Sequence, residues 1–248
     1  MRADERAHPA VAARGPDRAA RVRDLFASIA PRYELVNRVA SGGRDRAWRR
    51  AVVRELRLGP GQWCLDACCG TGDLSRAVAA CGASVVAVDS CRPMLREGWR
   101  RPPRGGVIAW AEADALQLPA ATASMDAGCV AFGLRNVGDP ARGLSELARV
   151  VRPGGRVAVL EFSRPPSRTV RWLYEIYSRR VLPILGDLLS GSWGTYRYLP
   201  ETIRTWLSAD EVAAAMRRAG IEAVRVMPMS LGIVTLHVGV VASPTPRG

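Results

Sequence analysis

Hydrophobic and polar positions follow two different periods along the middle of the chain. Short apolar runs of strand length end in acidic or polar residues, and each run is followed by a stretch with helical spacing. The apolar runs predict strands at 63–65, 83–88, 107–111, 125–131 and 156–162. Between the last two, a helix that starts at Asp139-Pro140 is expected to continue to Val151, and Pro153-Gly154-Gly155 is expected to end it. Strands that alternate with helices in this way are typical of an α/β fold with a parallel sheet.

Two helical regions interrupt this alternation. Apolar residues recur at helical spacing over 17–29 and again over 46–56, ahead of the first strand. We expect residues 17–58 to form a helical lid over the carboxyl ends of the strands. Residues 164–207, after the fifth strand, form an apolar and mainly helical insertion, which can wall a greasy substrate pocket or simply cap the core.

The two ends of the chain differ in pattern. Residues 1–16 are rich in Ala, Arg and Pro without periodicity and predict a disordered tail, which leaves 17–248 as a single domain. An S-x-x-E capping pattern predicts a helix over 208–220. Two apolar segments, 222–227 and 232–240, then predict strands that run antiparallel to each other.

Composition is that of a globular protein. The 248 residues are 48% hydrophobic, which suffices for a sizeable core. No apolar run reaches the roughly 18 residues of a membrane span, and no hydrophobic signal region is present, so we expect a soluble cytoplasmic chain. The six cysteines form no C-x-x-C pair, and the two histidines, His8 and His237, lie far apart. We therefore expect reduced, buried thiols and no metal site.

The formal charge of the chain is +13, and all 36 basic residues are arginine. Such a surface can bind an anionic membrane or a nucleic acid, and it can equally consist of solvated helix faces with alternating charges. Of the two binding interpretations we favour peripheral contact with an anionic membrane, at the inner face of the cell membrane, and expect no nucleic acid partner. The oligomeric state is left open, with a homodimer among the options.

The turn after the first strand carries the strongest chemical signal. Asp66 ends the apolar run, and Gly70 and Gly72 let the backbone turn tightly and approach a ligand closely. A dinucleotide site is one alternative, but Ser75 stands where its third glycine is needed, and Asp73 at the helix N-terminus would repel a phosphate. The order of acid and glycines instead resembles the S-adenosylmethionine loop of Rossmann-like methyltransferases, and an ordinary glycine-bearing turn between a strand and a helix is the other alternative.

Acidic residues follow the next two strands as well. Asp89 ends the second strand, where its carboxylate can accept hydrogen bonds from both hydroxyls of a ribose; capping the following helix is its alternative role. After the third strand, Asp114 can accept from an adenine amino group, and the backbone N–H of Ala115 can serve a ring nitrogen. The carboxyl ends of parallel strands share one edge, so these groups are expected to surround one ligand.

Longer motifs resemble the C-methyltransferases of ubiquinone and menaquinone biosynthesis. The matching stretches are Tyr33 with Asn37, Ser41 and Trp48; residues 132–136; residues 149–155 with 160–163; and residues 192–199. The resemblance implies a Rossmann-like, seven-stranded class I methyltransferase sheet with helices on both faces and its last strand reversed. It also implies S-adenosylmethionine as the cofactor. Four residues match cofactor-binding positions of the family: Thr71, Asp89, Asp114 and Ala115.

The activity that this resemblance implies is C-methylation of a polyprenylated quinol ring. Demethylmenaquinol is the favoured substrate, and a benzoquinol of the ubiquinone route is the alternative. Ionising one phenol makes the ring carbon nucleophilic, and Arg135 is our candidate to stabilise the phenolate. A salt bridge from Arg135 to Asp139 or Glu161 is its alternative role. Asn136 or Tyr33 can orient the hydroxyl or a water that takes the proton.

The chain departs from the family pattern at a few positions. Glu34 stands where the family has Asp, and Ala131 replaces a Ser that the family places beside the cofactor. An RNA methyltransferase would explain the positive charge, but residues 132–135 stand where base-amine methyltransferases have a (D/N)-P-P-(Y/F) sequence. A non-catalytic protein that binds the cofactor is the third hypothesis.

Overall fold

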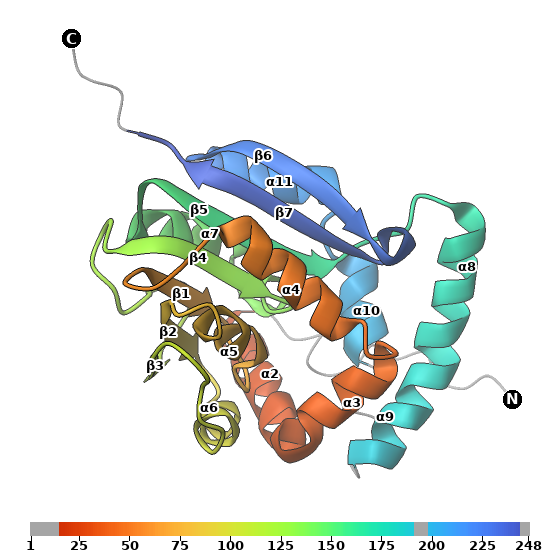
Figure 1. Cartoon of the computed structure of the whole chain (residues 1–248). Helices are drawn as coiled ribbons and strands as arrows, with labels where there is room; N and C mark the ends of the chain where they lie inside the picture. Colours follow the sequence, from red (N-terminus) through yellow and green to blue (C-terminus); the bar gives the residue numbers. More distant parts are fainter. Residues whose placement is uncertain (1–14, 191–197, 244–248) are drawn as a thin grey trace, which may run out of the picture.

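The computed structural model describes residues 15–190 and 198–243, which build a seven-stranded sheet with helices on both faces (Figure 1). The strands are β1 (Trp63–Ala67), β2 (Ser84–Asp89), β3 (Ile108–Glu112), β4 (Met125–Ala131), β5 (Val151–Phe162), β6 (Ile221–Met229) and β7 (Val234–Val241). Their order is β3-β2-β1-β4-β5-β7-β6. Neighbouring strands are parallel except at β7, which runs antiparallel to β5 and β6. The predicted α/β sheet with its last strand reversed is confirmed.

Helices precede the sheet, connect its strands and follow β5. The α-helices are α2 (Gly15–Ile29), α3 (Tyr33–Ala40), α4 (Asp45–Leu56), α5 (Asp73–Ala79), α6 (Arg92–Trp99), α7 (Pro140–Val150), α8 (Arg168–Ile176), α9 (Leu182–Ser190), α10 (Tyr198–Thr205) and α11 (Ala209–Arg218). Three 3-10 turns are η1 (Ala30–Arg32), η2 (Leu134–Asn136) and η5 (Ser230–Gly232), and a π-helical turn, η3 (Tyr177–Val181), joins α8 to α9. The described residues of both predicted helical regions, 17–58 and 164–207, are therefore mainly helical, and residues 191–197 of the second region lie outside the described residues.

The sheet is buried on both faces because its strands carry apolar side chains toward two helical layers. α4 and α5 cover one face, where Cys64 and Ala158 are fully buried (Figure 1). α7 and α11 cover the other, where Leu65 and Val157 are fully buried. Successive residues of a strand point to opposite faces, so an unbroken apolar run fills both layers. A ligand is then accommodated at the ends of the strands.

The connections that follow β1 and β4 lead to opposite sides of the sheet. β1 continues to β2 and β3 on one side, whereas β4 continues to β5 on the other. In open α/β sheets, ligands bind in the crevice where the connections diverge in this way. The loop after β1 contains Gly70, and the turn after β4 contains Arg135. The strand order thus places the two predicted groups of site residues at one crevice.

The structure corrects the prediction at the start of β5. We expected a helix to Val151 and a break at Pro153-Gly154-Gly155, but Val151 already pairs with Met125 of β4. The register then shifts before Ala127 pairs with Arg156. Gly154 takes a φ of +79°, which lets the chain deviate within the strand instead of ending it.

Two smaller differences concern the tail and the cysteines. Gly15 and Pro16, expected in the disordered tail, belong to α2, and residues 1–14 lie outside the described residues. All six cysteines are free, as expected, but the expectation of burial is wrong for Cys81, which is exposed. Within the described part of the chain, no helix is long and apolar enough to cross a membrane.

Candidate active site

The loop between β1 and α5 depends on left-handed backbone conformations. Cys68, Gly70 and Gly72 have φ angles of +54°, +57° and +79°. The Gly72 amide donates to the carbonyl of Cys69 at 2.9 Å and closes the turn. A Cβ on Gly72 would lie 2.2 Å from the ring of Trp110. Gly72 is therefore required by close packing as well as by the turn itself.

A cavity of about 570 Å³ opens at this loop, at the carboxyl ends of β1, β2 and β4; we call it the cofactor cavity. The predicted cofactor residues that line it are Asp66, Gly70, Thr71, Asp89, Asp114 and Ala115. Gly72 does not line it and supports the loop from behind. Tyr33 and Asn136, predicted as catalytic residues, line the same cavity. The structure thus brings together groups from separate parts of the chain.

Asp66 lies beneath the cofactor cavity with only 1% of its surface exposed. The Ser75 hydroxyl donates to its Oδ2 at 2.5 Å, and the Cys129 thiol lies 3.6 Å from its Oδ1. Burial raises the pKa of Asp66 to about 6, although both of these hydrogen bonds act to lower it. The carboxyl therefore changes charge in the mildly acidic range.

The position of Asp89 suits both roles considered for it: capping the following helix and binding the hydroxyls of a ribose. Its Oδ2 accepts from the Gly70 amide and its Oδ1 from the Cys91 amide, each at 2.8 Å, so it ties the loop to the start of α6. The carboxylate also lines the cofactor cavity, where its remaining lone pairs can accept further hydrogen bonds. Burial raises the pKa of Asp89, against the lowering effect of the two amides. Asp114 lines the exposed rim and accepts from the Leu116 amide at 2.9 Å.

A second cavity, of about 650 Å³, adjoins the first; we call it the apolar cavity. Most of its wall comes from α2, α3, α4, η5 and the region of α8 to α10. Among the described residues, four line both cavities: Phe26, Tyr33, Arg49 and Phe132. The rings of Phe26 and Tyr33 stack edge to face with centroids 6.0 Å apart. A cavity rich in carboxylates therefore meets a more apolar cavity at a wall that contains aromatic rings.

Arg135 lines the apolar cavity and is only 6% exposed. Its Nη1 donates to Glu161 Oε1 and to the carbonyl of Phe132, both at 2.6 Å. Its guanidinium lies 5.2 Å from the centroid of the Phe162 ring. Asp139 accepts an amide hydrogen bond at the start of α7. Of the two salt-bridge partners that the sequence left open, the structure contains Glu161.

Glu161 is 1% exposed and forms a buried ion pair with Arg135. Burial raises the pKa of Glu161, and the neighbouring Arg135 charge opposes that rise. Arg135 Nε has no hydrogen-bond partner among the described residues. The Arg135 guanidinium therefore places a positive charge at the wall of the apolar cavity, and one of its N–H donors is not used by the described protein.

The other two predicted catalytic residues lie around the junction of the cavities. Asn136 Oδ1 accepts from the hydroxyl of Tyr198 at 2.8 Å, which orients the amide. Burial raises the pKa of Tyr33, and its hydrogen bond with Asn37 opposes that rise. Tyr33 thus remains a neutral hydroxyl that can donate one hydrogen bond and accept others.

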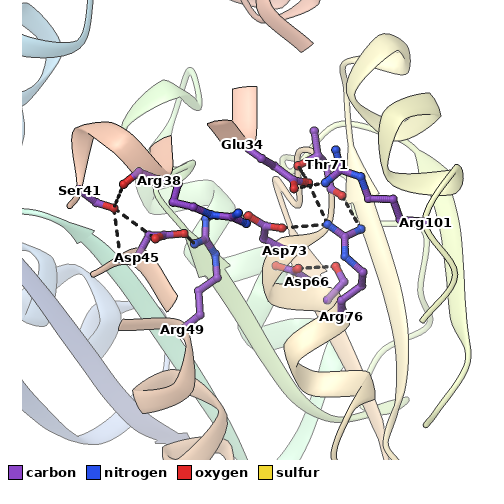
Figure 2. A network of polar contacts seen from close by, with 11 residues as sticks. Glu34, Arg38, Ser41, Asp45, Arg49, Asp66, Thr71, Asp73, Arg76 and Arg101 are labelled. Atoms are coloured by element: carbon purple, nitrogen blue, oxygen red, sulfur yellow. Dashed lines mark hydrogen bonds and ion pairs between the residues drawn. The ribbon is translucent and has the colours of Figure 1, made fainter. Parts of the chain in front are cut away.

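Glu34 connects the N-terminal helices to the cofactor loop (Figure 2). Its Oε1 accepts from Thr71 Oγ1 at 2.8 Å and from Arg76 at 2.9 Å, and its Oε2 pairs with Arg101. Arg76 also pairs with Asp73 at 2.9 Å. We call these five residues the clasp. The clasp links α3 to the loop, to α5 and to the chain after α6.

The ionic contacts continue from the clasp to α4. Arg49 pairs with Asp45 at 2.6 Å and with Asp73 at 3.6 Å (Figure 2). The Ser41 hydroxyl lies 3.2 Å from Asp45 Oδ1. Because Arg49 lines both cavities, its charge is held at their junction by two carboxylates.

Sequence reasoning missed several of these residues. In the sequence, Glu34 is noticeable only as a departure from a family pattern. Arg49 lies in a stretch of helical spacing that does not indicate a role at the cavities. Tyr174, part of the apolar helical insertion predicted over 164–207, lines the apolar cavity, and burial raises its pKa well above the ordinary value for tyrosine. The available signal for Arg49 was its i,i+4 spacing from Asp45. The spacing of Tyr174 predicted a buried face but not that this face borders a cavity.

We expect the substitution Glu34→Gln to raise the Kd for S-adenosylmethionine about tenfold. The change removes the charge that Arg76 and Arg101 share, and hydrogen bonds to charged groups contribute about 1.5–3 kcal/mol each. Titration calorimetry measures the effect. Glu97→Gln is the matched control, since Glu97 pairs with Arg100, whose side chain is 74% exposed, and a Kd within about twofold of the parent is expected. Equal affinities for both variants would show that the clasp does not hold the loop for binding.

The raised pKa of Asp66 predicts a pH-dependent stability. The folded protein keeps the Asp66 proton up to about pH 6, whereas the unfolded chain releases it near pH 3.8. The protonated carboxyl therefore makes its full contribution to the free energy of unfolding below pH 3.8, and this contribution is lost as the pH rises through 6. The free energy of unfolding of the parent should therefore fall relative to that of Asp66→Asn between about pH 4 and pH 7. Denaturant titrations of the ligand-free proteins test this, with the exposed Asp24→Asn as a control that follows the parent. A difference that stays constant with pH would contradict it.

Comparison with solved structures shows the fold. A crystal structure of a SAM-dependent methyltransferase from Aquifex aeolicus matches with a TM-score of 0.59 and 17% identity, over 84% of this chain and 98% of that chain. The [4+2]-cyclase SpnF matches with a TM-score of 0.58 and 18% identity, over 84% of this chain and 74% of that chain. The sheet is therefore that of the class I methyltransferases.

Sequence comparison is more specific. The chain is 44% identical to a demethylmenaquinone methyltransferase from Thermus thermophilus, over 87% of this chain and 99% of the relative. It is also 44% identical to a ubiquinone/menaquinone biosynthesis C-methyltransferase from Syntrophotalea carbinolica, over 88% of this chain and 92% of the relative. The model of the ubiE/COQ5 methyltransferase family matches residues 16–241. On these matches and on the cavities described above, the chain belongs to the ubiE/COQ5 methyltransferase family.

Proposed function

We propose that this protein transfers a methyl group from S-adenosylmethionine to a ring carbon of a polyprenylated quinol. The observation that carries the proposal is the meeting of the cofactor cavity and the apolar cavity at a wall that includes Tyr33 and Phe132. Relatives named demethylmenaquinone methyltransferase favour demethylmenaquinol as the substrate. A benzoquinol is the second candidate, since other relatives are named for both biosynthetic routes.

The donor set of the cofactor cavity fits S-adenosylmethionine. Asp66, Asp73 and Asp89 place carboxylates around a cavity that would attract a cationic ligand, and Asp89 keeps lone pairs for ribose hydroxyls. Asp114 and the backbone of Ala115 would serve the adenine. When bound, the cofactor supplies an electrophilic methyl group. Asp66 is ionised above about pH 6, so its attraction for the cation is complete at neutral and alkaline pH.

The residues of the junction would prepare the quinol. A phenol of this kind has an ordinary pKa of about 10, and the buried Arg135 guanidinium would favour its phenolate, which makes the ring carbon nucleophilic. Tyr33 and Asn136 would orient the hydroxyl or the water that takes its proton. The aromatic wall excludes water, which strengthens these electrostatic interactions and holds the ring in place.

The proposal extends to the elements that surround the junction. Residues 17–58 would act as a lid, because α2 and α3 contribute to the walls of both cavities and the clasp fastens α3 to the cofactor loop. The polyprenyl tail of the substrate resides in a lipid bilayer. We therefore include peripheral contact with an anionic membrane in the proposed function.

The first experiment measures methyl transfer from labelled S-adenosylmethionine to a reduced short-chain demethylmenaquinone and, in parallel, to a matching benzoquinol. We expect a labelled naphthoquinol that carries the methyl group on a ring carbon, identified by product mass and fragmentation. Label in the benzoquinol alone would reassign the ring. Label in neither, with cofactor binding intact by calorimetry, would overturn the proposed function.

We expect Arg135→Gln to lower kcat about 10²- to 10³-fold, since it removes one preorganised electrostatic contact to the developing phenolate. The double variant Arg135→Gln/Glu161→Gln removes both buried charges and so leaves no unpaired carboxylate. Its kcat should stay as low as that of the single variant. Recovery of activity in the double variant would assign Arg135 to holding the loop alone. Arg142→Gln, at an exposed position of α7, is the control and should match the parent.

A further inference from the structure

A stripe of exposed apolar side chains runs along the outer side of α8, η3 and α9. Trp172 and Ile176 are four positions apart, as are Ile184 and Leu188, and Val181 lies between the two pairs. The π-turn η3 inserts one additional residue, which keeps both pairs on one side of the helical rod. Trp172 is 60% exposed and Leu188 73% exposed, although both are large apolar side chains.

The stripe continues onto two neighbouring elements. α3 packs against α9 and carries exposed Leu35 and Val39, and η5 carries Leu231, which is 75% exposed. These residues and the stripe form the surface that we call the mouth face: Leu35, Val39, Trp172, Leu173, Ile176, Val181, Ile184, Leu188 and Leu231. They are nine of the twelve large apolar side chains that are exposed in the described part of the chain. Figure 1 shows α3, α8 and α9 together at one edge of the molecule.

The mouth face surrounds the entrance of the apolar cavity. Val39, Leu173 and Leu231 are exposed to solvent and also line that cavity. The entrance is therefore rimmed by apolar side chains, and the apolar surface is continuous from the cavity wall to the outside of the protein. An exposed apolar surface of this extent indicates a site of contact with another apolar surface.

The charges on these elements indicate what kind of surface the mouth face contacts. Exposed arginines accompany the apolar residues: Arg38, Arg44, Arg168, Arg171, Arg179 and Arg180. On the described residues of α3, α8, η3 and α9, Glu175 is the one exposed carboxylate. An anionic lipid surface complements this charge, whereas a second copy of a chain with formal charge +13 would repel it.

We propose that the mouth face docks on an anionic bilayer, with its apolar side chains among the lipid tails and its arginines at the phosphates. This inference assigns a surface to the membrane contact included in the proposed function, and it rests on that function for the path of the substrate. In that path, the prenyl tail stays in the bilayer while the ring passes between Val39, Leu173 and Leu231 into the apolar cavity. The protein then needs no transfer of the tail through water.

The test is co-sedimentation with vesicles that contain phosphatidylglycerol and phosphatidylcholine, and with vesicles of phosphatidylcholine alone. We expect binding to the anionic vesicles that weakens at high salt. The double variant Ile184→Glu/Leu188→Glu should lose at least about tenfold in binding, since two exposed apolar contacts are replaced by charges that the lipids repel. Both residues are exposed and neither lines the cofactor cavity or the apolar cavity, so we expect folding and catalysis to be preserved.

The matched control is Trp99→Glu/Val107→Glu, which removes two comparably exposed apolar side chains beside β3, at the edge of the sheet, and adds the same charge. Its vesicle binding should stay within about twofold of the parent. Equal losses in both variants would mean that net charge alone governs binding and would overturn the mouth face. So would a dimer, seen by sedimentation velocity, that dissociates in Ile184→Glu/Leu188→Glu while vesicle binding persists.

Methyl transfer separates this inference from the function on which it draws. The Ile184→Glu/Leu188→Glu variant should methylate a short-chain quinol in solution like the parent, and should lose activity toward a long-chain quinol in anionic vesicles. A parent protein that methylates the short-chain quinol but binds no vesicles would overturn the mouth face and the membrane contact, and would leave the methyl transfer standing. A parent that binds vesicles through the mouth face but methylates neither quinol would overturn the function alone.

Discussion

The buried ion pair between Arg135 and Glu161 fixes the segment that separates the two cavities. Arg135 lies in the turn after β4 and Glu161 near the end of β5, and the two meet because Ala131 and Leu160 are paired in the sheet. Removing one partner of such a pair typically costs about 3–5 kcal/mol, since a buried charge is left without compensation. Phe132, whose carbonyl also binds Arg135, lines both cavities. The wall between cofactor and substrate therefore depends on the strand order.

The clasp couples the two cavities through a single helix. Glu34 is adjacent to Tyr33 on α3, and it binds Thr71 of the cofactor loop. The helix that carries Tyr33 to both cavities is therefore fastened to the cofactor loop. Because both carboxylate oxygens of Glu34 are engaged by cations or a hydroxyl, α3 has little freedom to shift without breaking charged contacts. The cofactor loop and one wall of the apolar cavity are thus held by the same set of contacts.

Most of the fold and part of the site could be predicted from the sequence. Strand runs, glycine turns and the acids at strand ends are local patterns, so the sequence alone suffices to place Asp66, Gly70 and Asp89 at one edge of the sheet. The partner of Arg135 could not be predicted, because Asp139 and Glu161 are equally plausible by charge and only the pairing of β4 with β5 decides. The break predicted at Pro153-Gly154-Gly155 was wrong for a similar reason. The local sequence favours a break, but pairing with β4 lets β5 continue across these residues. Contacts between segments far apart in the sequence, such as the one that Glu34 makes with Arg101, leave no local pattern at all.

The sheet by itself does not determine the chemistry, since a [4+2]-cyclase shares it with methyltransferases. In this chain the sheet and its loops build the cofactor cavity, whereas most of the apolar cavity comes from α2, α3, α4 and the elements between β5 and α11. Those same elements carry most of the exposed mouth face. In the proposed function, one set of helices selects the apolar ring, brings it to the junction and presents the entrance to the bilayer in which the substrate dissolves. A change of substrate class would need changes in these helices and few in the sheet.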